Sequence, residues 1–157
     1  MPALAHIGIG LATKRFAPQI PLWALIISAM FIDLLSFIFI FAIWISHGLF
    51  MSVIWSIIAM LITILITKRL NLKSDYLRIT LIIGFLVFSH WILDFIGWPM
   101  SVINPNATGV PLLFDDTINI GLGVYSTWFG ALLMDIGVFV LGLILYLYYL
   151  KKTKKIK

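Results

Sequence analysis

The chain has 157 residues, of which 62% are hydrophobic and only 11% are charged, and its net charge is +5. A soluble domain carries about 25% charged residues, so this composition excludes a water-soluble protein and indicates an integral membrane protein of one domain. The chain contains no Cys, which excludes disulfides and zinc–thiolate sites. Nucleic-acid binding is not indicated either, because the Lys and Arg residues lie in short clusters beside apolar runs, a pattern typical of membrane topology and lipid contact.

In chain order, the apolar segments predict an all-α fold with a short N-terminal helix and four transmembrane helices. The segment 3–13 is too short to span a bilayer and could form an interfacial or a half-inserted helix. Its basic pair follows the apolar stretch, the reverse of a secretory signal, so we expect it to stay in the mature protein. Four runs reach the length of about 20 residues that a span needs: 21–46, 49–67, 77–98 and 128–150. An external loop, 99–127, and a basic tail, 151–157, complete the single transmembrane domain 1–157.

The positions of the basic residues predict the orientation of the spans. Two basic residues precede the first span, four surround the connection between the second and third, and five follow the fourth, which accounts for all 11 Lys and Arg residues. With four spans, these three clusters fall on one side of the membrane, and the positive-inside rule makes that side the cytoplasm. We therefore expect both termini to be cytoplasmic and the protein to lie in the inner (cytoplasmic) membrane.

Five ionisable residues lie within or against the apolar runs: Asp33, His47, His90, Asp94 and Asp135. An Asp near the centre of a transmembrane helix costs about 2.5–3.5 kcal/mol on insertion scales. Such residues usually face the interior of a helix bundle and mark functional sites. The alternative for any single Asp is that it is protonated, hydrogen-bonded and purely structural.

The depths of these residues predict that they lie close together. At about 1.5 Å per helical residue, Asp33, His90, Asp94 and Asp135 all lie ~19–25 Å from the cytoplasmic edge of their spans. They therefore share one layer in the outer half of the bilayer, and His47 lies just above it. A sixth residue, His6, would lie just below this layer if the N-terminal helix dips into the membrane.

The stretch "FSHWILDF", residues 88–95, gives the clearest local signal for a chemical site. The spacing of four places His90 and Asp94 on one helix face, with Cβ atoms about 6 Å apart. Imidazole and carboxylate together are ligands for Zn²⁺ or Mn²⁺, and they are also components of proton relays. On the last span, Asp135 shares its face with Ala131 and Gly142, small residues that let helices approach closely.

Motifs along nearly the whole chain resemble the membrane-bound metal-dependent hydrolases, the YdjM-like bacterial inner-membrane proteins. The similar blocks are "HIGIG", "FIDLL", "SHGLFMSVIWS", "SHWILDF" and "GLGVYSTWFGALLMDIGVF". The resemblance implies a divalent metal ion, zinc first and manganese second, and it implies five metal ligands: His6, Asp33, His47, His90 and Asp94. The chain lacks the Pro-Asp-x-Asp-His block of that family and the second His before the Ser-His pair, so we expect one metal ion rather than two.

Three functions follow from these observations. The first is hydrolysis of a lipid or lipid-linked substrate, with Asp135, or whichever of Asp33 and Asp94 is not a ligand, as catalytic base. The second is a small ion or proton transporter that uses the same polar layer, although the chain has no inverted repeat and no span interrupted by Pro. The third is a structural or assembly subunit in which the polar layer only joins helices.

Overall fold

The computed structural model of the chain describes residues 3–39, 42–69, 76–102 and 104–154. Three of the predicted topology signals, Lys73, Lys155 and Lys157, lie outside the described residues. Helices dominate the described part of the chain: α1 (Ala3–Thr13), α2 (Leu22–Ala29), α3 (Phe31–Ser36), α4 (Ile43–His47), α5 (Leu49–Arg69), α6 (Tyr76–Gly97) and α7 (Trp128–Lys154). The predicted external loop contains two short antiparallel strands, β1 (Val110–Pro111) and β2 (Asn119–Ile120), and the 3-10 helix η1 (Val124–Ser126).

Three of the described helices, α5, α6 and α7, are long and apolar enough to cross a membrane. Each begins within one residue of a predicted span, because a long apolar run leaves the backbone no better way to satisfy its hydrogen bonds in lipid than a continuous helix. The molecule is therefore a largely helical membrane protein. The fourth span and the cytoplasmic position of both termini stay predictions.

The segment of the first predicted span, 21–46, differs from the continuous helix expected there. It contains the three short helices α2, α3 and α4. Met30, between α2 and α3, has φ −98° and ψ 7°, outside helical geometry, and no Pro interrupts the segment. Interrupted helices occur at membrane depth where the backbone is buried in protein, and this break lies against the polar residues of α6.

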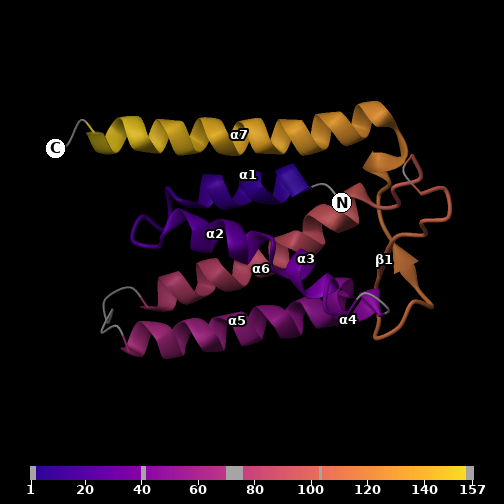
Figure 1. Cartoon of the computed structure of the whole chain (residues 1–157), viewed down its shortest axis with the longest axis horizontal. Helices are drawn as coiled ribbons and strands as arrows, with labels where there is room; N and C mark the ends of the chain where they lie inside the picture. Colours follow the sequence, from indigo (N-terminus) through magenta and orange to yellow (C-terminus); the bar gives the residue numbers. More distant parts are fainter. Residues whose placement is uncertain (1–2, 40–41, 70–75, 103, 155–157) are drawn as a thin grey trace.

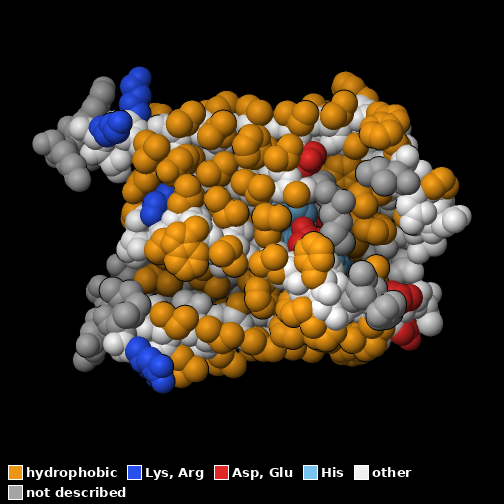
Figure 2. Space-filling model, in the orientation of Figure 1, with side chains coloured by type: hydrophobic (Ala, Val, Ile, Leu, Met, Phe, Trp, Pro, Cys, Tyr) orange, Lys and Arg blue, Asp and Glu red, His pale blue; other side chains and the backbone are white. Residues whose placement is uncertain are grey.

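The helices run side by side, with α6 among them and α5 and α7 on the outside (Figure 1). About half of the α6 residues are buried, whereas α5 and α7 expose most of their apolar side chains. Lys and Arg gather at the end of the molecule where α5 ends, α6 begins and α7 ends, and hydrophobic side chains cover most of the face between the two ends (Figure 2). This distribution suits a protein whose long helices face lipid.

The N-terminal helix α1 packs inside this arrangement, between α7 and α2 (Figure 1). Gly8 of α1 and Gly142 of α7 lie backbone to backbone, and a Cβ at Gly142 would collide with the Gly8 carbonyl. Small residues allow such close approach between membrane helices. α1 packs along α7, and the two alternatives for this segment, interfacial or half-inserted, stay predictions.

Candidate metal centre

All five predicted metal ligands lie together inside the helix bundle. His6 comes from α1, Asp33 from α3, His47 from the end of α4, and His90 and Asp94 from α6. The three histidines and Asp94 are at most 1% exposed, and Asp33 is 7% exposed. Four separate helices therefore contribute side chains to one buried polar cluster. Figure 2 shows a small area of Asp or Glu (red) and His (pale blue) among the hydrophobic side chains.

The imidazole Nε2 atoms of the cluster face carboxylate oxygens. His47 Nε2 lies 3.5 Å from Asp33 Oδ1 and 3.5 Å from Asp94 Oδ2. His90 Nε2 lies 3.5 Å from Asp33 Oδ1 and 3.4 Å from Asp94 Oδ2. His6 Nε2 lies 3.8 Å from the other oxygen of Asp94, Oδ1. The two carboxylates thus lie between the three rings.

These nitrogen–oxygen separations are longer than direct hydrogen bonds and lie in the range of neighbouring ligands of a metal ion. A charge-assisted hydrogen bond from a ring nitrogen to a carboxylate is about 2.7–2.9 Å long, shorter than every distance in the cluster. A tetrahedral ion with bond lengths of about 2.0–2.2 Å keeps its ligands about 3.3–3.6 Å apart. The four distances that join His47 and His90 to Asp33 and Asp94 lie in that range.

The tautomer of His90 follows from its hydrogen bond to the break between α2 and α3. Its Nδ1 lies 3.0 Å from the carbonyl oxygen of Ala29, the last residue of α2. A carbonyl only accepts, so Nδ1 carries the proton and donates it. The last carbonyls of a helix have no partner within the helix. Because α2 ends at Ala29, the carbonyl of this residue is available to accept the hydrogen bond from His90. Nε2 of the neutral ring therefore presents its lone pair to Asp33 and Asp94.

The tautomer of His47 follows from Ser46 by the same reasoning. The Ser46 hydroxyl donates to the carbonyl of Ile43 at 3.0 Å, which uses its single proton. Ser46 Oγ also lies 2.8 Å from His47 Nδ1, and while the hydroxyl proton is on the Ile43 carbonyl, Nδ1 is the donor in that contact. Nε2 of His47 then presents a lone pair to the same two carboxylates. Hydrogen bonds of this kind orient metal-ligating histidines and select their tautomer.

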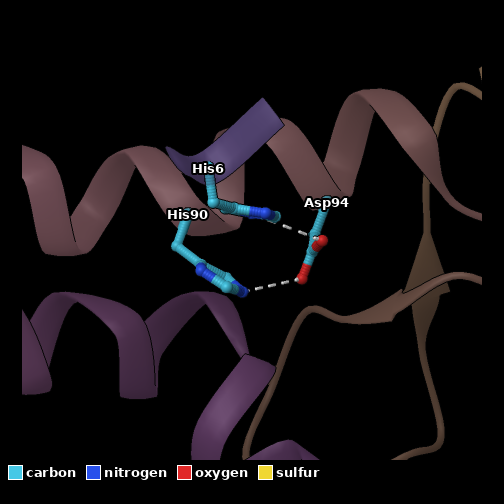
Figure 3. Close-up of side chains that lie close together, drawn as sticks. All are labelled: His6, His90 and Asp94. Atoms are coloured by element: carbon cyan, nitrogen blue, oxygen red, sulfur yellow. Dashed lines mark ion pairs between the residues drawn. The ribbon is translucent and has the colours of Figure 1, made fainter. Parts of the chain in front are cut away.

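His6 approaches the cluster in a different way. Its ring is stacked on the ring of His90, with centroids 3.8 Å apart and planes 25° from parallel. Both rings point toward Asp94, one to each carboxylate oxygen (Figure 3). Stacked, nearly parallel rings do not direct both lone pairs at one point. Asp94 therefore separates the contacts of His6 from those of His47 and His90.

The buried atoms of the cluster could hold a cation. Several buried side-chain atoms of the described residues have no hydrogen-bond partner, and those of the cluster include Asp33 Oδ1, both oxygens of Asp94, and Nε2 of His47 and of His90. These atoms all carry lone pairs and face one another, and buried carboxylates without a partner are costly. The described residues contain two overlapping groups that could hold a metal ion, His6–His90–Asp94 and Asp33–His47–His90. A cation in either group would satisfy the lone pairs that face it.

Asp135, the predicted catalytic base, lies apart from both of these groups. It is half-buried on α7, and its Oδ1 accepts a hydrogen bond of 2.8 Å from the backbone N–H of Ala5. A carboxylate at this place accepts a hydrogen bond from an N–H that has no partner within the helix, and the positive end of the α1 dipole stabilises its negative charge. Asp135 thus joins α7 to the first turn of α1, one residue before His6.

Three groups near the site were not expected from the sequence. The Ala29 carbonyl orients His90 and the Ser46 hydroxyl orients His47. The sequence indicated Ser46 only as the neighbour of His47 in the Ser-His pair, and it gave no indication of Ala29. Tyr125 of η1 packs against Gly97 of α6, where a Cβ would collide with its ring. Burial raises the pKa of Tyr125, and the charges of Asp135 and Asp94 raise it further, so its phenol stays a neutral hydrogen-bond donor.

No family model, curated protein or solved structure matches this chain.

Proposed function

We propose that this protein is a membrane-bound metal-dependent hydrolase of the YdjM-like kind. The observation that carries the proposal is the convergence of three histidine Nε2 atoms on two buried carboxylates at 3.4–3.8 Å. Two carboxylates carry a charge of −2 when the rings are neutral, so one divalent ion would make the cluster electrically neutral. Nitrogen and oxygen donors without thiolate suit zinc first and manganese second.

The proposed ligands of the ion are Asp33, His47, His90 and Asp94, with His6 beside Asp94. These residues would hold a divalent ion, which would lower the pKa of a water and so supply the nucleophile for hydrolysis. Asp94 Oδ1 faces His6 rather than the other rings, so this oxygen is suited to accept a hydrogen bond from a water. Asp135 remains the proposed base, reached through a rearrangement at the first turn of α1.

The substrate class follows from the surroundings of the cluster. Long apolar helices with exposed Leu, Ile and Phe side chains flank it, so the proposed substrate is a lipid or a lipid-linked molecule. The proposed location is the bacterial inner membrane, with the cluster in the outer half of the bilayer. The basic residues at one end of the molecule support this orientation (Figure 2).

The test is the metal content of purified protein, followed by turnover. Protein supplied with Zn²⁺ and Mn²⁺ should retain about one divalent ion per chain. Removal of this ion by a chelator should lower the melting temperature. Where the free metal is about 100 times its Kd, the ion contributes about 2.7 kcal/mol to the free energy of unfolding. The loaded protein should hydrolyse ester or phosphoester lipids, and the chelated protein should not. Wild-type protein that binds no stoichiometric metal, and whose melting ignores the chelator, would overturn the proposal.

A second candidate function is transport of the ion itself. The observation that favours it is the break between α2 and α3, because transporters hold ions with the ends of interrupted helices near the middle of the membrane. The carbonyl of Ala29 at this break contacts His90. Proteoliposomes loaded with a zinc-sensitive dye separate the two functions. Zinc uptake without lipid turnover would favour transport, and turnover without uptake would favour hydrolysis.

A further inference from the structure

An apolar groove of about 660 Å³ lies between α1 and α6, toward the end of the molecule where Lys and Arg gather. Its volume is within the range of small-molecule sites, about 300–1,000 Å³. Most of its wall consists of exposed or half-buried apolar side chains: Ile9, Ala12, Phe16, Leu77, Leu81, Ile82 and Phe85. These side chains are open to the surroundings, so a molecule that lies in the groove can contact them directly.

The groove exists because α1 packs mainly against α7 and α2 and only lightly against α6. The wall residues of α6, from Leu77 to Phe85, recur one turn apart and so lie on one face of that helix. They cover ~12 Å along the helix axis, close to one leaflet of a hydrocarbon core about 30 Å thick. Since α6 is long and apolar enough to cross a membrane, the groove matches one acyl chain in length and direction.

Charge identifies the head of this occupant. Arg78 lies in the first turn of α6, and among the described residues of the wall it is the one charged side chain. It is exposed, and it forms no ion pair with a described residue. A guanidinium binds phosphate through paired N–H bonds, and basic residues at a membrane surface attract anionic lipids. An occupant with an apolar chain in the groove and a phosphate at Arg78 satisfies both requirements.

We propose that this groove binds one acyl chain of an anionic phospholipid, with the phosphate of the lipid at Arg78. This lipid is not the proposed substrate, because Arg78 and His90 lie ~18 Å apart along the axis of α6. The far end of the chain does approach the cluster, since Ile9 in the wall lies one turn after His6 on α1. The lipid therefore fills the space between α1 and α6 and supports the helix that carries His6.

The test identifies the lipid that stays bound to the purified protein. Protein in a mild detergent is mixed with equal amounts of phosphatidylglycerol, which is anionic, and phosphatidylcholine, which has no net charge. Native mass spectrometry then records which lipid each chain retains. Wild-type protein should retain a single phosphatidylglycerol in preference to phosphatidylcholine. Glycerol phosphate, which has a phosphate but no acyl chain, should not be retained.

Two substitutions test the two parts of the site, each with a matched control on α5. Leu81→Trp fills the groove and should remove the lipid, whereas Leu61→Trp changes a side chain of the same 56% exposure outside the groove and should not. Arg78→Gln removes the charge and should weaken binding of phosphatidylglycerol about fivefold. Arg69→Gln removes an exposed charge at the same end of the molecule, outside the groove, and should leave binding unchanged.

Melting temperature, oligomeric state and metal content are measured on the same samples. If Leu81→Trp does not fold, the comparison of Arg78→Gln with Arg69→Gln decides. Equal retention of the two lipids, or equal binding by those two Arg variants, would overturn the assignment of the head group. Equal loss of lipid from Leu81→Trp and Leu61→Trp would overturn the site. A dimer that Leu81→Trp dissociates would make a second copy of the chain the occupant.

The metal centre and the lipid groove can fail separately. Protein that holds metal and retains no lipid would overturn the groove proposal and leave the metal centre standing. Phosphatidylglycerol binding that depends on Leu81 and Arg78, in protein that holds no metal, would support the groove and contradict the proposed hydrolase.

Discussion

Two apolar segments that follow one another in the chain, α2–α4 and α5, differ in how they satisfy their polar side chains. In α5, the hydroxyls of Ser56, Thr63 and Thr67 donate to carbonyls one turn earlier in the same helix. The helix needs no outside partner for them, and it is continuous. In α2–α4, Asp33 and His47 face residues of another helix, and the segment is broken.

The difference shows what kind of polar residue requires tertiary structure in an apolar helix. A hydroxyl can return its hydrogen bond to its own backbone, whereas a carboxylate or imidazole has to find a partner across the bundle. The break at Met30 allows two such contacts. The Ala29 carbonyl accepts a hydrogen bond from His90, and Asp33 faces the same ring. The interrupted backbone and the ionisable side chains therefore occur together in α2–α4, and α5 contains neither of them within the apolar part of its helix.

The largest expected effect tests whether the broken segment crosses the membrane as α5 does. The chain has no natural Cys, so single cysteines at Gln19, Asn106 and Thr153 report the side of each position. In intact cells, an impermeant thiol reagent should label Asn106→Cys and leave Gln19→Cys and Thr153→Cys unlabelled until the membrane is opened. Labelling at position 19 from outside would show that α2–α4 does not cross, and the comparison with α5 would fail.

The next effect is loss of the metal. Asp33→Asn removes a charge that no neighbour replaces, and should reduce bound metal from about one ion per chain to none, with the protein still inserted. Asp94→Asn and His90→Gln should do the same. Ser56→Ala in α5 is the matched control, since it removes a buried polar group that bonds only its own helix. Bound metal that persists in all three ligand variants would leave only the structural interpretation of the cluster.

Asp135→Asn should lower the rate of hydrolysis about 10²- to 10⁴-fold, the contribution of a general base, while metal content stays unchanged. The amide oxygen of Asn can still accept the hydrogen bond from Ala5, so α1 stays in place. Asp135→Leu removes that acceptor and should also lower the melting temperature. Full activity of Asp135→Asn combined with instability of Asp135→Leu would make Asp135 a positioning residue and not the base.

The smallest effect concerns the orientation of His47. Ser46→Ala removes the acceptor of the Nδ1–H bond, and should weaken metal affinity about 10- to 100-fold, measured by competition with a metal indicator. Ser28→Ala is the control, because the Ser28 hydroxyl donates to the Ala24 carbonyl within α2 and contacts no histidine in the described contacts. Equal affinities of the two variants would show that His47 is held by packing alone.

Much of this arrangement could be predicted from the sequence. The long helices begin where their apolar runs begin, since length and hydropathy alone specify a membrane helix. Depth counting placed Asp33, His90, Asp94 and Asp135 in one layer, with His47 above it and His6 below it. Five of these side chains lie together, but Asp135 lies apart from them and contacts the backbone of α1. The count succeeds because costly groups from different helices can be satisfied only where they meet.

Other features had no signal in the sequence. The break at Met30 contains neither Pro nor Gly, so only the contact of the Ala29 carbonyl with His90 explains it. Gly142 was a candidate for close helix packing, but the identity of its partner, Gly8, depends on tertiary structure across the whole chain. The contact of Asp135 with Ala5 spans 130 positions, a distance at which local patterns predict nothing.

The crossing of Gly8 and Gly142 also sets an order in time. The chain is made from its N-terminus, and α1 emerges first, yet the helix against which it packs is made last. α2–α6 are therefore made before Gly8 and Ala5 can contact Gly142 and Asp135 on α7, and His6 cannot take its final position earlier. A nascent or truncated chain already contains all five polar residues of the cluster but cannot seat the first of them. The cluster is complete only when α7 has been made and has packed against α1, so the position of His6 would report a finished molecule.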